Sequence, residues 1–250
     1  MQPTSLYDLR GEKALSDKSS YSLPQSILTP YEYARTLVPQ VFPGGKKFLD
    51  LCCGIGIHSL WALTKGYEVV GVDLSAKSIE AARKVFSEKV EPQSVPAEFH
   101  LGDALEFLSR GSQYEVIFMS GSLYYFQLNE IVPKVLSSLK TGGSFICVET
   151  FADNPFMALY RKIRYGLWKK RDRASVENLM GSVEIKKLEN FFVKSSTKYF
   201  DFTTLATGLL PERLAGGTVL RLARRTDNFL LNSLNLRGLS YKFVFHGVKL

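Results

Sequence analysis

Short apolar runs alternate with amphipathic segments along the middle of the chain, from Lys46 to Thr150. Runs of this length between polar turns are typical of buried strands, and we expect five of them, at 46–52, 67–74, 97–102, 114–120 and 144–150. The intervening segments have apolar residues at helical spacing, which predicts helices at 57–65, 76–89, 104–110 and 128–140, the last closed by Gly142 and Gly143. Strands joined by helices run parallel, so we expect helices on both faces of an open sheet.

The segments on either side of this region have weaker patterns. Residues 1–45 are rich in Ser, Pro and Tyr and show no sustained period, although a helix is expected from Thr29 to about Pro39. Beyond Thr150 we expect, in order, an insert, a helical stretch, an extended run, a long helical region and a last strand, at 153–173, 174–188, 191–202, 209–235 and 241–248. The two extended segments bring the expected number of strands to seven.

The first expected strand runs into a turn with two closely spaced glycines, in FLDLCCGIGIHS at 48–59. Glycines let a backbone approach a ligand closely, and the turn leads to the N-terminus of the next helix. An acidic residue also lies near the end of each of the first three expected strands: Asp50 precedes this turn, Asp73 ends the second strand and Asp103 follows the third. Because the carboxyl ends of parallel strands meet at one edge of a sheet, we expect these groups to line a single nucleotide crevice.

This order of motifs resembles the class I S-adenosylmethionine-dependent methyltransferases over about residues 46–150. The resemblance implies a Rossmann-like fold with a mostly parallel seven-stranded sheet, and it implies S-adenosyl-L-methionine as cofactor and S-adenosyl-L-homocysteine as product. It places the glycine-rich turn against the methionine part of the cofactor, Asp73 at the ribose and Asp103 at the adenine amino group. The implied cofactor residues are Asp50, Cys52, Gly54, Gly56, Asp73, Leu74, Asp103, Ala104, Met119 and Ser120. The family usually has a glycine where this chain has Cys52, and we expect the small cysteine side chain to be tolerated.

The resemblance also implies a domain organisation. We expect an N-terminal lid or leader at 1–45 and a methyltransferase domain at 46–250, which includes the insert and a C-terminal, substrate-side part at 174–250.

The methyl acceptor is harder to predict from the sequence than the cofactor, because the protein mainly has to align the acceptor with the cofactor. The segment after the fourth strand reads MSGSLYYF, without the Asx-Pro-Pro-aromatic motif of base amino-methyltransferases. The Pro-Cys nucleophile and the paired glutamates of arginine methyltransferases are also missing. The sequence therefore favours a small-molecule O- or N-methyltransferase, and no nucleic-acid partner is expected. The tail at 226–249 resembles the C-terminal portion of methyltransferases that act on saccharides, lipids and secondary metabolites, which implies a saccharide, a lipid-linked compound or a secondary metabolite as acceptor.

Candidate acceptor residues come from the ends of the expected strands and from the lid: Tyr31, Tyr124, Tyr125 and Glu149. Packing at the start of a helix explains the Tyr124–Tyr125 pair equally well. His58, His100 and His246 are better explained by structural roles, so no general base is assigned.

The composition indicates the kind of protein and the compartment in which it works. The chain has 250 residues, of which 45% are hydrophobic, enough for a sizeable core. Its three cysteines, Cys52, Cys53 and Cys147, show neither a disulfide framework nor a CxxC motif, so they are expected to pack and no metal is implied. The start of the chain does not resemble a targeting segment, and no apolar run is long enough to span a membrane. We therefore expect a cytoplasmic protein, whose oligomeric state the sequence leaves open.

The formal net charge is +8, and the densest basic cluster is RKIRYGLWKKRDR at 161–173. Phe156, Tyr160, Ile163 and Leu167 form one helical stripe beside these basic residues. Such a segment serves either as a lid or dimer helix with a solvated basic side, or as a helix that rests on an anionic membrane or covers an acidic acceptor.

Two other functions share parts of this pattern. A nicotinamide-dependent oxidoreductase would have the strand, the turn and the ribose acid, but Ser59 stands where its third glycine is expected and Asp103 has no role there. A non-catalytic partner protein could retain the methyltransferase fold, because these enzymes need no obligatory catalytic motif.

Overall fold

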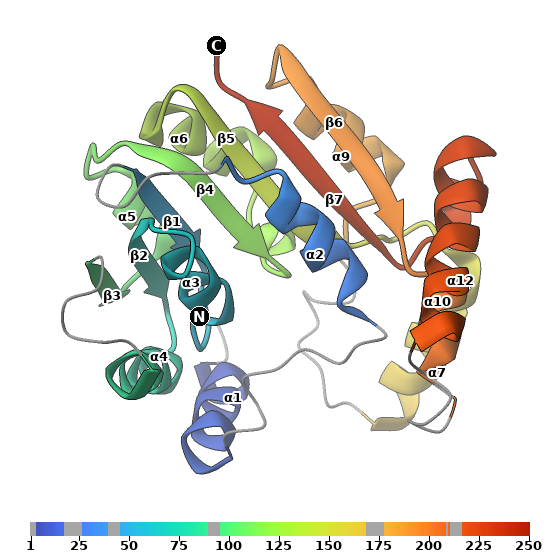
Figure 1. Cartoon of the computed structure of the whole chain (residues 1–250), viewed down its shortest axis with the longest axis horizontal. Coiled ribbons are helices and arrows are strands. Elements are labelled where there is room, and N and C mark those ends of the chain that lie inside the picture. Colours follow the sequence, from blue (N-terminus) through green and yellow to red (C-terminus); the bar gives the residue numbers. More distant parts are fainter. Residues whose placement is uncertain are drawn as a thin grey trace.

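The computed structural model describes residues 4–17, 27–39, 46–89, 96–168, 178–208, 210 and 217–250. These residues form a seven-stranded sheet in the order β3-β2-β1-β4-β5-β7-β6 (Figure 1). The strands are β1 Lys47–Leu51, β2 Glu68–Asp73, β3 Ala97–Leu101, β4 Tyr114–Ser120, β5 Leu139–Thr150, β6 Lys194–Phe200 and β7 Lys242–Val248. Strands β1 to β5 pair in parallel, and β7 is antiparallel to both β5 and β6. The expected mostly parallel sheet of seven strands is confirmed.

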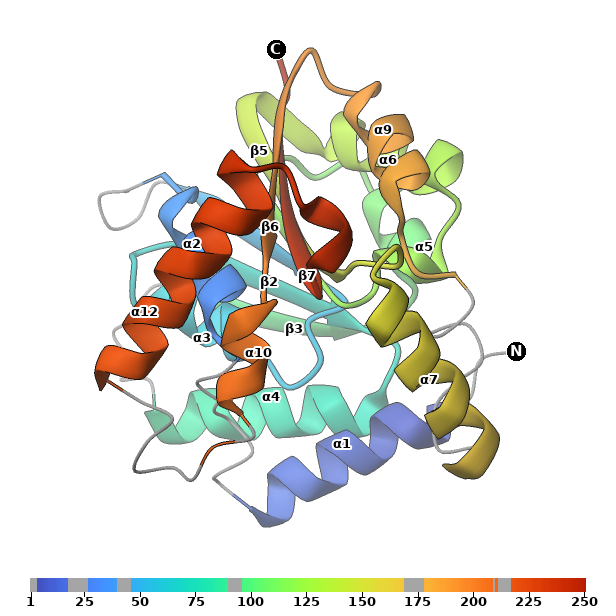
Figure 2. The same cartoon turned by 90° about the vertical axis from the view of Figure 1, so that its right-hand side faces the viewer.

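Helices cover both faces of this sheet, which Figure 2 shows edge-on. One face packs against α2 Thr29–Thr36, α3 Ile57–Leu63 and α4 Ala76–Lys89. The other face packs against α5 Ala104–Leu108, α6 Leu128–Ser138 and α9 Ser182–Glu189. The two apolar layers arise because successive strand residues point to opposite faces; Phe118 packs on the α2 side, for example, whereas Met119 packs on the α6 side.

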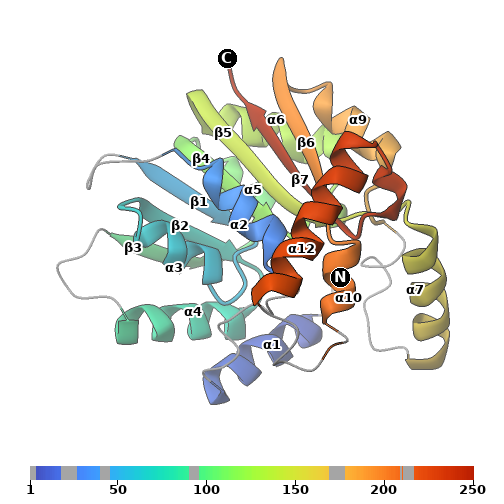
Figure 3. The same ribbon diagram turned by 45° about the vertical axis from the view of Figure 1, so that its right-hand side comes forward.

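Helix α1, Thr4–Ser16, differs from the expectation that the N-terminal segment has no regular structure before Thr29. It runs beside α4 at the edge of the molecule (Figures 2 and 3). The contact is made through small residues rather than an apolar stripe: a Cβ on Gly11 would collide with the backbone of Lys77 and Ser78, and Ala14 is buried. Because the helix packs through small residues, no helical repeat of apolar residues marks it in the sequence.

The end of α6 also differs from the expectation. The helix ends at Ser138 with Leu139 already extended, so Gly142 and Gly143 lie within β5 and do not close the helix. The amide of Gly142 donates a hydrogen bond to the Lys249 carbonyl, and the amide of Lys249 donates one to the Gly143 carbonyl. The glycines thus join the start of β5 to the end of the chain.

The C-terminal part consists of further helices and the two antiparallel strands, as expected. It includes α7 Pro155–Trp168, α10 Thr203–Thr207, α12 Gly217–Asp227, the π-helix η4 Asn228–Ser233 and the short 3-10 helix η5 Arg237–Leu239. Asn232 covers the free edge of β6, because its side-chain amide accepts from the Tyr199 N–H at 3.1 Å and donates to the Tyr199 carbonyl at 3.0 Å. Parts of the expected segments, 169–177, 209 and 211–216, lie outside the described residues.

Candidate functional site

The strand register brings the predicted acidic residues to one edge of the sheet. Asp50 of β1 pairs with Gly71 of β2, so Asp73 lies two residues farther toward the carboxyl edge. Asp73 in turn pairs with Leu101 of β3, and the amide of Gly102 donates to the Asp73 carbonyl at 3.0 Å. Asp103 follows at once. The three acids therefore lie along the carboxyl ends of three neighbouring strands, the edge at which open parallel sheets bind ligands.

The Asp73 carboxylate organises the glycine-rich turn. Its Oδ2 accepts a hydrogen bond from the Gly54 amide at 2.8 Å, and its Oδ1 accepts from the Ser75 amide at 2.9 Å. Burial raises the pKa of Asp73, whereas these two amides lower it. Asp73 thus ties the β1 turn to the start of α4, while each oxygen retains a second lone pair for a ligand.

Three residues of the turn have left-handed backbone conformations: Cys52 with φ 60°, Gly54 with φ 53° and Gly56 with φ 78°. Glycine adopts this region without cost, but a residue with a Cβ does not. The turn geometry that glycine would give at position 52 is therefore kept by Cys52, under strain. Burial raises the pKa of the Cys52 thiol, and the negative charge of Asp73 adds to this effect.

Asp50 is covered and faces α3. It is 1% exposed, and its Oδ2 accepts a hydrogen bond from the Ser59 hydroxyl at 2.6 Å. Burial raises the pKa of Asp50 to about 7, partly opposed by the Ser59 bond. This carboxyl group consequently fixes the start of α3 behind the turn.

Asp103 is the N-cap of α5. Its Oδ1 accepts from the amides of Leu105 at 2.8 Å and Glu106 at 3.1 Å. The neighbouring Ala104 is buried at 3% exposure, so only its backbone is available to a ligand.

Open space lies in front of this edge. A Cβ built on Gly54, Gly102 or Gly121 would meet no atom within 4 Å. Leu74, directly after Asp73, is 49% exposed, and Leu101 is similarly exposed. Apolar side chains that border open backbone between two carboxylates can hold a flat, polar-edged ring.

The end of β4 is held by a buried glutamate. Glu149 Oε1 accepts from the amides of Ser122 at 3.0 Å and Leu123 at 2.8 Å. Burial raises the pKa of Glu149 to about 7, and the amides of Leu123 and Ser122 lower it. Met119 is fully buried, whereas Ser120 is partly exposed at the strand end.

Tyr124 and Tyr125 form a pair just after β4, in the 3-10 helix η3, Leu123–Tyr125. Their ring centroids are 4.4 Å apart, and the Tyr124 hydroxyl donates to the Tyr125 hydroxyl at 3.3 Å. Both side chains are partly exposed. The pair is thus placed beside the end of β4.

Tyr31 lies on the other side of the same edge. Its ring stacks on His58 with centroids 5.3 Å apart, and His58 packs on Phe118 at 4.7 Å. Burial lowers the pKa of His58 to about 3, so this imidazole is neutral and buried within an aromatic cluster. His100 and His246 contact Glu98 and Ser144 instead, away from this cluster.

Two residues that sequence reasoning missed complete this region. Lys242, the first residue of β7, is 7% exposed with its ammonium 5.4 Å from the Tyr31 ring centroid. Asp201, directly after β6, is 1% exposed and has φ 63°. The only sequence signal was a lysine at the start of an otherwise apolar strand, YKFVFHGV, because the pairing of β6 with β7 could not be read from the sequence.

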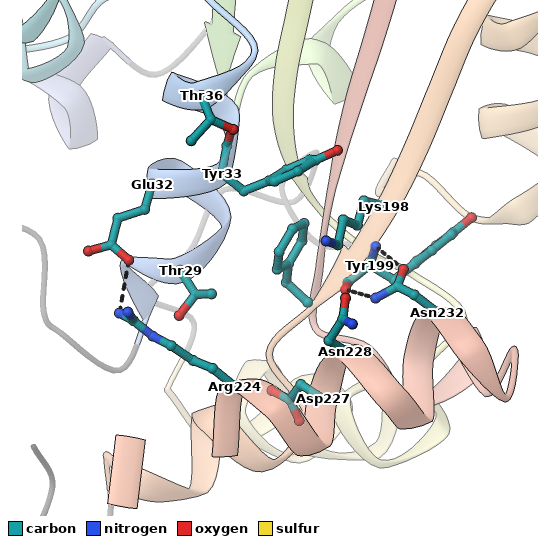
Figure 4. Close-up of a pocket in the computed structure, with 11 residues that line it drawn as sticks. Thr29, Glu32, Tyr33, Thr36, Lys198, Tyr199, Arg224, Asp227, Asn228 and Asn232 are labelled. Carbon is teal, nitrogen blue, oxygen red and sulfur yellow. Dashed lines mark hydrogen bonds and ion pairs between the residues drawn. The ribbon is translucent and has the colours of Figure 1, made fainter. Parts of the chain in front are cut away.

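A hollow of about 310 Å³ lies farther along the sheet, between α2, β6 and α12 (Figure 4). Glu32 and Arg224 form an ion pair of 3.0 Å across it, and the Lys198 ammonium lies 4.6 Å from the Tyr33 ring centroid. Phe200 and Asp227 also line the hollow, which brings it next to Asp201.

Comparisons with known proteins agree with this geometry. Residues 48–143 match the family described as Methyltransferase domain. A putative methyltransferase of Bacillus subtilis, YqeM, is 28% identical over 188 residues, which cover 69% of this chain and 70% of that protein. A putative ribosomal RNA large subunit methyltransferase of Methanocaldococcus jannaschii is 37% identical over 82 residues; the match spans 30% of this chain and only 20% of that protein.

Solved structures resemble the fold. The geranyl diphosphate C-methyltransferase of Streptomyces coelicolor, crystallised with S-adenosyl-L-homocysteine, superposes with a TM-score of 0.60 at 14% identity. The superposition covers 88% of this chain and 74% of that one.

Two features are absent from the described part of the chain. None of its helices is long and apolar enough to cross a membrane. The described residues also contain no group of three or more His, Cys, Asp or Glu side chains arranged to hold a metal ion.

Proposed function

The chain belongs to the class I S-adenosylmethionine-dependent methyltransferases, and we propose that it transfers the methyl group to an oxygen or nitrogen atom of a small-molecule acceptor. The observation that supports this proposal most directly is the open rim formed by Gly54, Asp73 and Asp103 at the carboxyl ends of three neighbouring strands. The methyltransferase match favours this activity over nicotinamide-dependent oxidation.

The residues of the rim fit the cofactor. S-adenosyl-L-methionine supplies an electrophilic methyl group on a positively charged sulfur. In our proposal Asp73 accepts hydrogen bonds from the ribose hydroxyls, and Asp103 faces the adenine amino group with Leu74 beside the ring. Gly54, Gly56 and Cys52 present the turn to the methionine part, and Ser120 borders it. Asp50, Ala104 and Met119 support these positions from the core, because their side chains are buried.

The chain contributes alignment more than acid-base chemistry in this proposal. Glu149 holds the amides of Ser122 and Leu123, so it fixes the loop that carries Tyr124 and Tyr125 at the end of β4. The tyrosine pair and Tyr31 approach the carboxyl edge from its two sides, where they can exclude water and orient the acceptor. We assign no general base.

The acceptor class rests on what the segment after β4 contains. Ser120 to Phe126 provide hydroxyl and aromatic groups but not the amide and proline residues that receive a flipped base. This composition supports a small molecule, although the ribosomal RNA relative makes RNA the alternative to be tested.

Incubation with tritium-labelled S-adenosyl-L-methionine separates these acceptor classes. The protein is given, in parallel, a small-molecule extract, total RNA and total protein from the source cells. We expect label in the small-molecule pool only, and we expect Asp73→Ala to reduce it. Label confined to RNA or protein would contradict the proposed acceptor class, and no label in any pool would favour a non-catalytic partner protein.

We also propose that α7 rests on an anionic membrane surface. Phe156, Leu159 and Ile163 lie on one side of this helix and are 54% to 66% exposed, so this face of α7 is open to solvent at these three residues. The helix stands at the edge of the molecule (Figure 3), and the cluster at 161–173 carries seven basic residues and one acidic residue. Apolar side chains flanked by basic residues favour the interface of an anionic bilayer. The side chain of Leu167 and residues 169–173 lie outside the described part.

Flotation with phosphatidylglycerol vesicles tests this surface. We expect salt-sensitive binding that is lost in the double variant Phe156→Ser and Ile163→Ser. Val193→Ser removes an even more exposed apolar side chain before β6 and serves as the control. If the double variant instead converts a dimer into a monomer in light scattering, the stripe is a dimer interface and the membrane proposal is wrong.

A further inference from the structure

Three buried ionisable side chains lie at the carboxyl edge formed by β5, β7 and β6, outside the cofactor assignments above. Lys242 pairs in register with Thr150 of β5 and with Phe200 of β6. Glu149 precedes Thr150, and Asp201 follows Phe200. The antiparallel strand β7 therefore brings together residues that are far apart in the sequence, next to the loop that follows β4.

Three of the four carboxyl oxygens in this cluster lack a hydrogen-bond donor among the described residues. Neither oxygen of Asp201 has a partner, although the residue is 1% exposed. Glu149 is fully buried, and only its Oε1 is used, so Oε2 also lacks a partner. More than about 90% of buried polar atoms in folded proteins are hydrogen-bonded, so three unsatisfied oxygens in one place require an explanation.

The backbone at Asp201 supports a functional explanation. Its φ of 63° lies in the left-handed region, which costs a residue with a Cβ on the order of 1 kcal/mol. One backbone donor holds this conformation, because the Tyr241 amide donates to the carbonyls of both Phe200 and Asp201, at 3.0 and 3.2 Å. The strained residue is thus kept with its carboxyl group buried beside Lys242.

Charged groups of both signs surround Asp201. Burial raises the pKa of Asp201 to about 7, against the lowering effects of Lys242 and Arg224 and with a further increase from Asp227. Arg224 is already paired with Glu32, and Asp227 accepts hydrogen bonds at the start of α10. Lys242 acts on Glu149 as well as on Asp201. Lys242 is thus the basic residue whose charge acts on both carboxyl groups.

We propose that Asp201 and Glu149 bind a positively charged amine of the methyl acceptor, so that the acceptor is an amine-bearing small molecule. An ammonium group supplies up to three hydrogen-bond donors and a positive charge that favours the ionised form of both carboxyl groups, whereas a neutral polyol supplies donors alone and an anion supplies neither. This inference rests on the proposed function, because it concerns the acceptor of that reaction.

The distances along the sheet suit a small acceptor. The end of β4 and the end of β6 are separated by three strand spacings, roughly 14 Å. An acceptor with its reacting atom near Ser120 can therefore reach Glu149 and Asp201 with a polar group at its other end. The hollow lined by Phe200, Arg224 and Asp227 lies close to Asp201, because Asp201 directly follows Phe200 and its pKa is affected by Arg224 and Asp227.

Fractionation of the acceptor pool tests the inference separately from the proposed function. A small-molecule extract is passed through a cation exchanger at low pH, which retains amines, and both fractions are then incubated with the protein and labelled S-adenosyl-L-methionine. We expect methyl transfer with the retained fraction only. Transfer with the flow-through alone would overturn the amine assignment and leave the proposed function intact, whereas no transfer even with the whole extract would count against both.

Asp201→Asn provides the second arm. Asparagine has the same shape and tolerates the left-handed backbone, so the fold is expected to persist. We expect affinity for S-adenosyl-L-homocysteine to stay within twofold, while methyl transfer to the retained fraction falls at least tenfold through a higher KM. Glu98→Gln, which neutralises an exposed acid on β3, is the control and should change neither quantity. Unchanged transfer by Asp201→Asn would overturn the inference.

Discussion

At the scale of single residues, the carboxyl group of Asp73 has two roles. It holds the amides of Gly54 and Ser75, and we propose that it also binds the ribose. Hydrogen bonds to a charged acceptor typically contribute on the order of 1.5 to 3 kcal/mol. We therefore expect Asp73→Ala to weaken the binding of S-adenosyl-L-homocysteine roughly ten- to hundredfold in calorimetric titration.

Asp73→Asn distinguishes the two tasks, because an amide retains one acceptor oxygen for the turn but offers less to the ribose. An affinity equal to that of the unaltered protein in both variants would remove the ribose assignment. Thermal unfolding in the absence of cofactor reports the loss of the turn contacts separately.

Cys52 shows the cost of a side chain at a position that favours glycine. Its φ of 60° costs on the order of 1 kcal/mol, and a branched side chain would be harder still to place there. We expect Cys52→Gly to leave the free energy of unfolding within about 1 kcal/mol, because relief of strain offsets the greater freedom of the unfolded chain. Cys52→Val is expected to lower it by about 1–2 kcal/mol.

Urea unfolding of the two Cys52 variants checks this difference. If Cys52→Val were as stable as the unaltered protein, the left-handed conformation would not be required at this turn. Binding of S-adenosyl-L-homocysteine should follow the same order, since the turn is part of the proposed site.

At the scale of elements, the strands and crossovers of the core could be predicted because each one has its own local pattern. The turn at Gly54 and the acids Asp73 and Asp103 were found for the same reason, as they follow recognisable strands. Helix α1 was missed because Gly11 and Ala14 pack closely without an apolar stripe. The α6 boundary was misplaced because the glycine pair suggested a helix end although the extended conformation starts at Leu139.

Helix α1 makes a prediction of its own. Gly11 allows α1 to lie against the first turn of α4, where Asp8 also accepts a hydrogen bond from the Ser75 hydroxyl at 2.6 Å. We expect Gly11→Leu to displace α1, because its side chain would overlap the α4 backbone. Hydrogen exchange of residues 4–16 should become much faster, and the exposed Asp73 loop should exchange faster too.

Glu12→Leu is the matched control for this experiment, since Glu12 is on the exposed side of the same helix. It should leave exchange unchanged. Equal protection of α1 in Gly11→Leu and in the unaltered protein would mean that the close contact is not needed to hold α1, and an N-terminal lid built on it would lose its basis.

At the scale of the whole molecule, buried acidic residues that are far apart in the sequence lie along the carboxyl edge of the sheet. Asp50, Glu149 and Asp201 come from β1, β5 and the end of β6. The individual acids Asp50 and Glu149 were accessible to sequence reasoning as strand-end residues. The meeting of Asp201 with Lys242 was not, because it depends on the antiparallel pairing of two strands separated by several helices.

These buried acids make the stability of the fold depend on pH. Burial raises the pKa of Asp50, Glu149 and Asp201 to about 7 in each case, above their ordinary values of 3.8 to 4.5. The folded state therefore holds these protons more tightly than the unfolded state. Their contribution to stability is complete below about pH 4 and is lost as the pH rises through about 7. Ser59 and Asp73 act on Asp50, Lys242 acts on Glu149, and Lys242, Asp227 and Arg224 act on Asp201.

Asp201→Asn isolates one of these contributions, because the variant keeps the shape of the side chain and cannot ionise. We expect its free energy of unfolding to exceed that of the unaltered protein by on the order of 2 kcal/mol at pH 8, given about 1.4 kcal/mol per unit of pKa change and a partial cost for the buried amide. At pH 4 the advantage should disappear, since Asp201 is then protonated in the folded protein. Urea unfolding at pH 4, 6 and 8 measures the difference between the two proteins, in which the effects of Asp50, Glu149 and the net positive charge cancel. A difference that does not change with pH would mean that Asp201 ionises in its ordinary range, and the pH dependence assigned to its burial would then be absent.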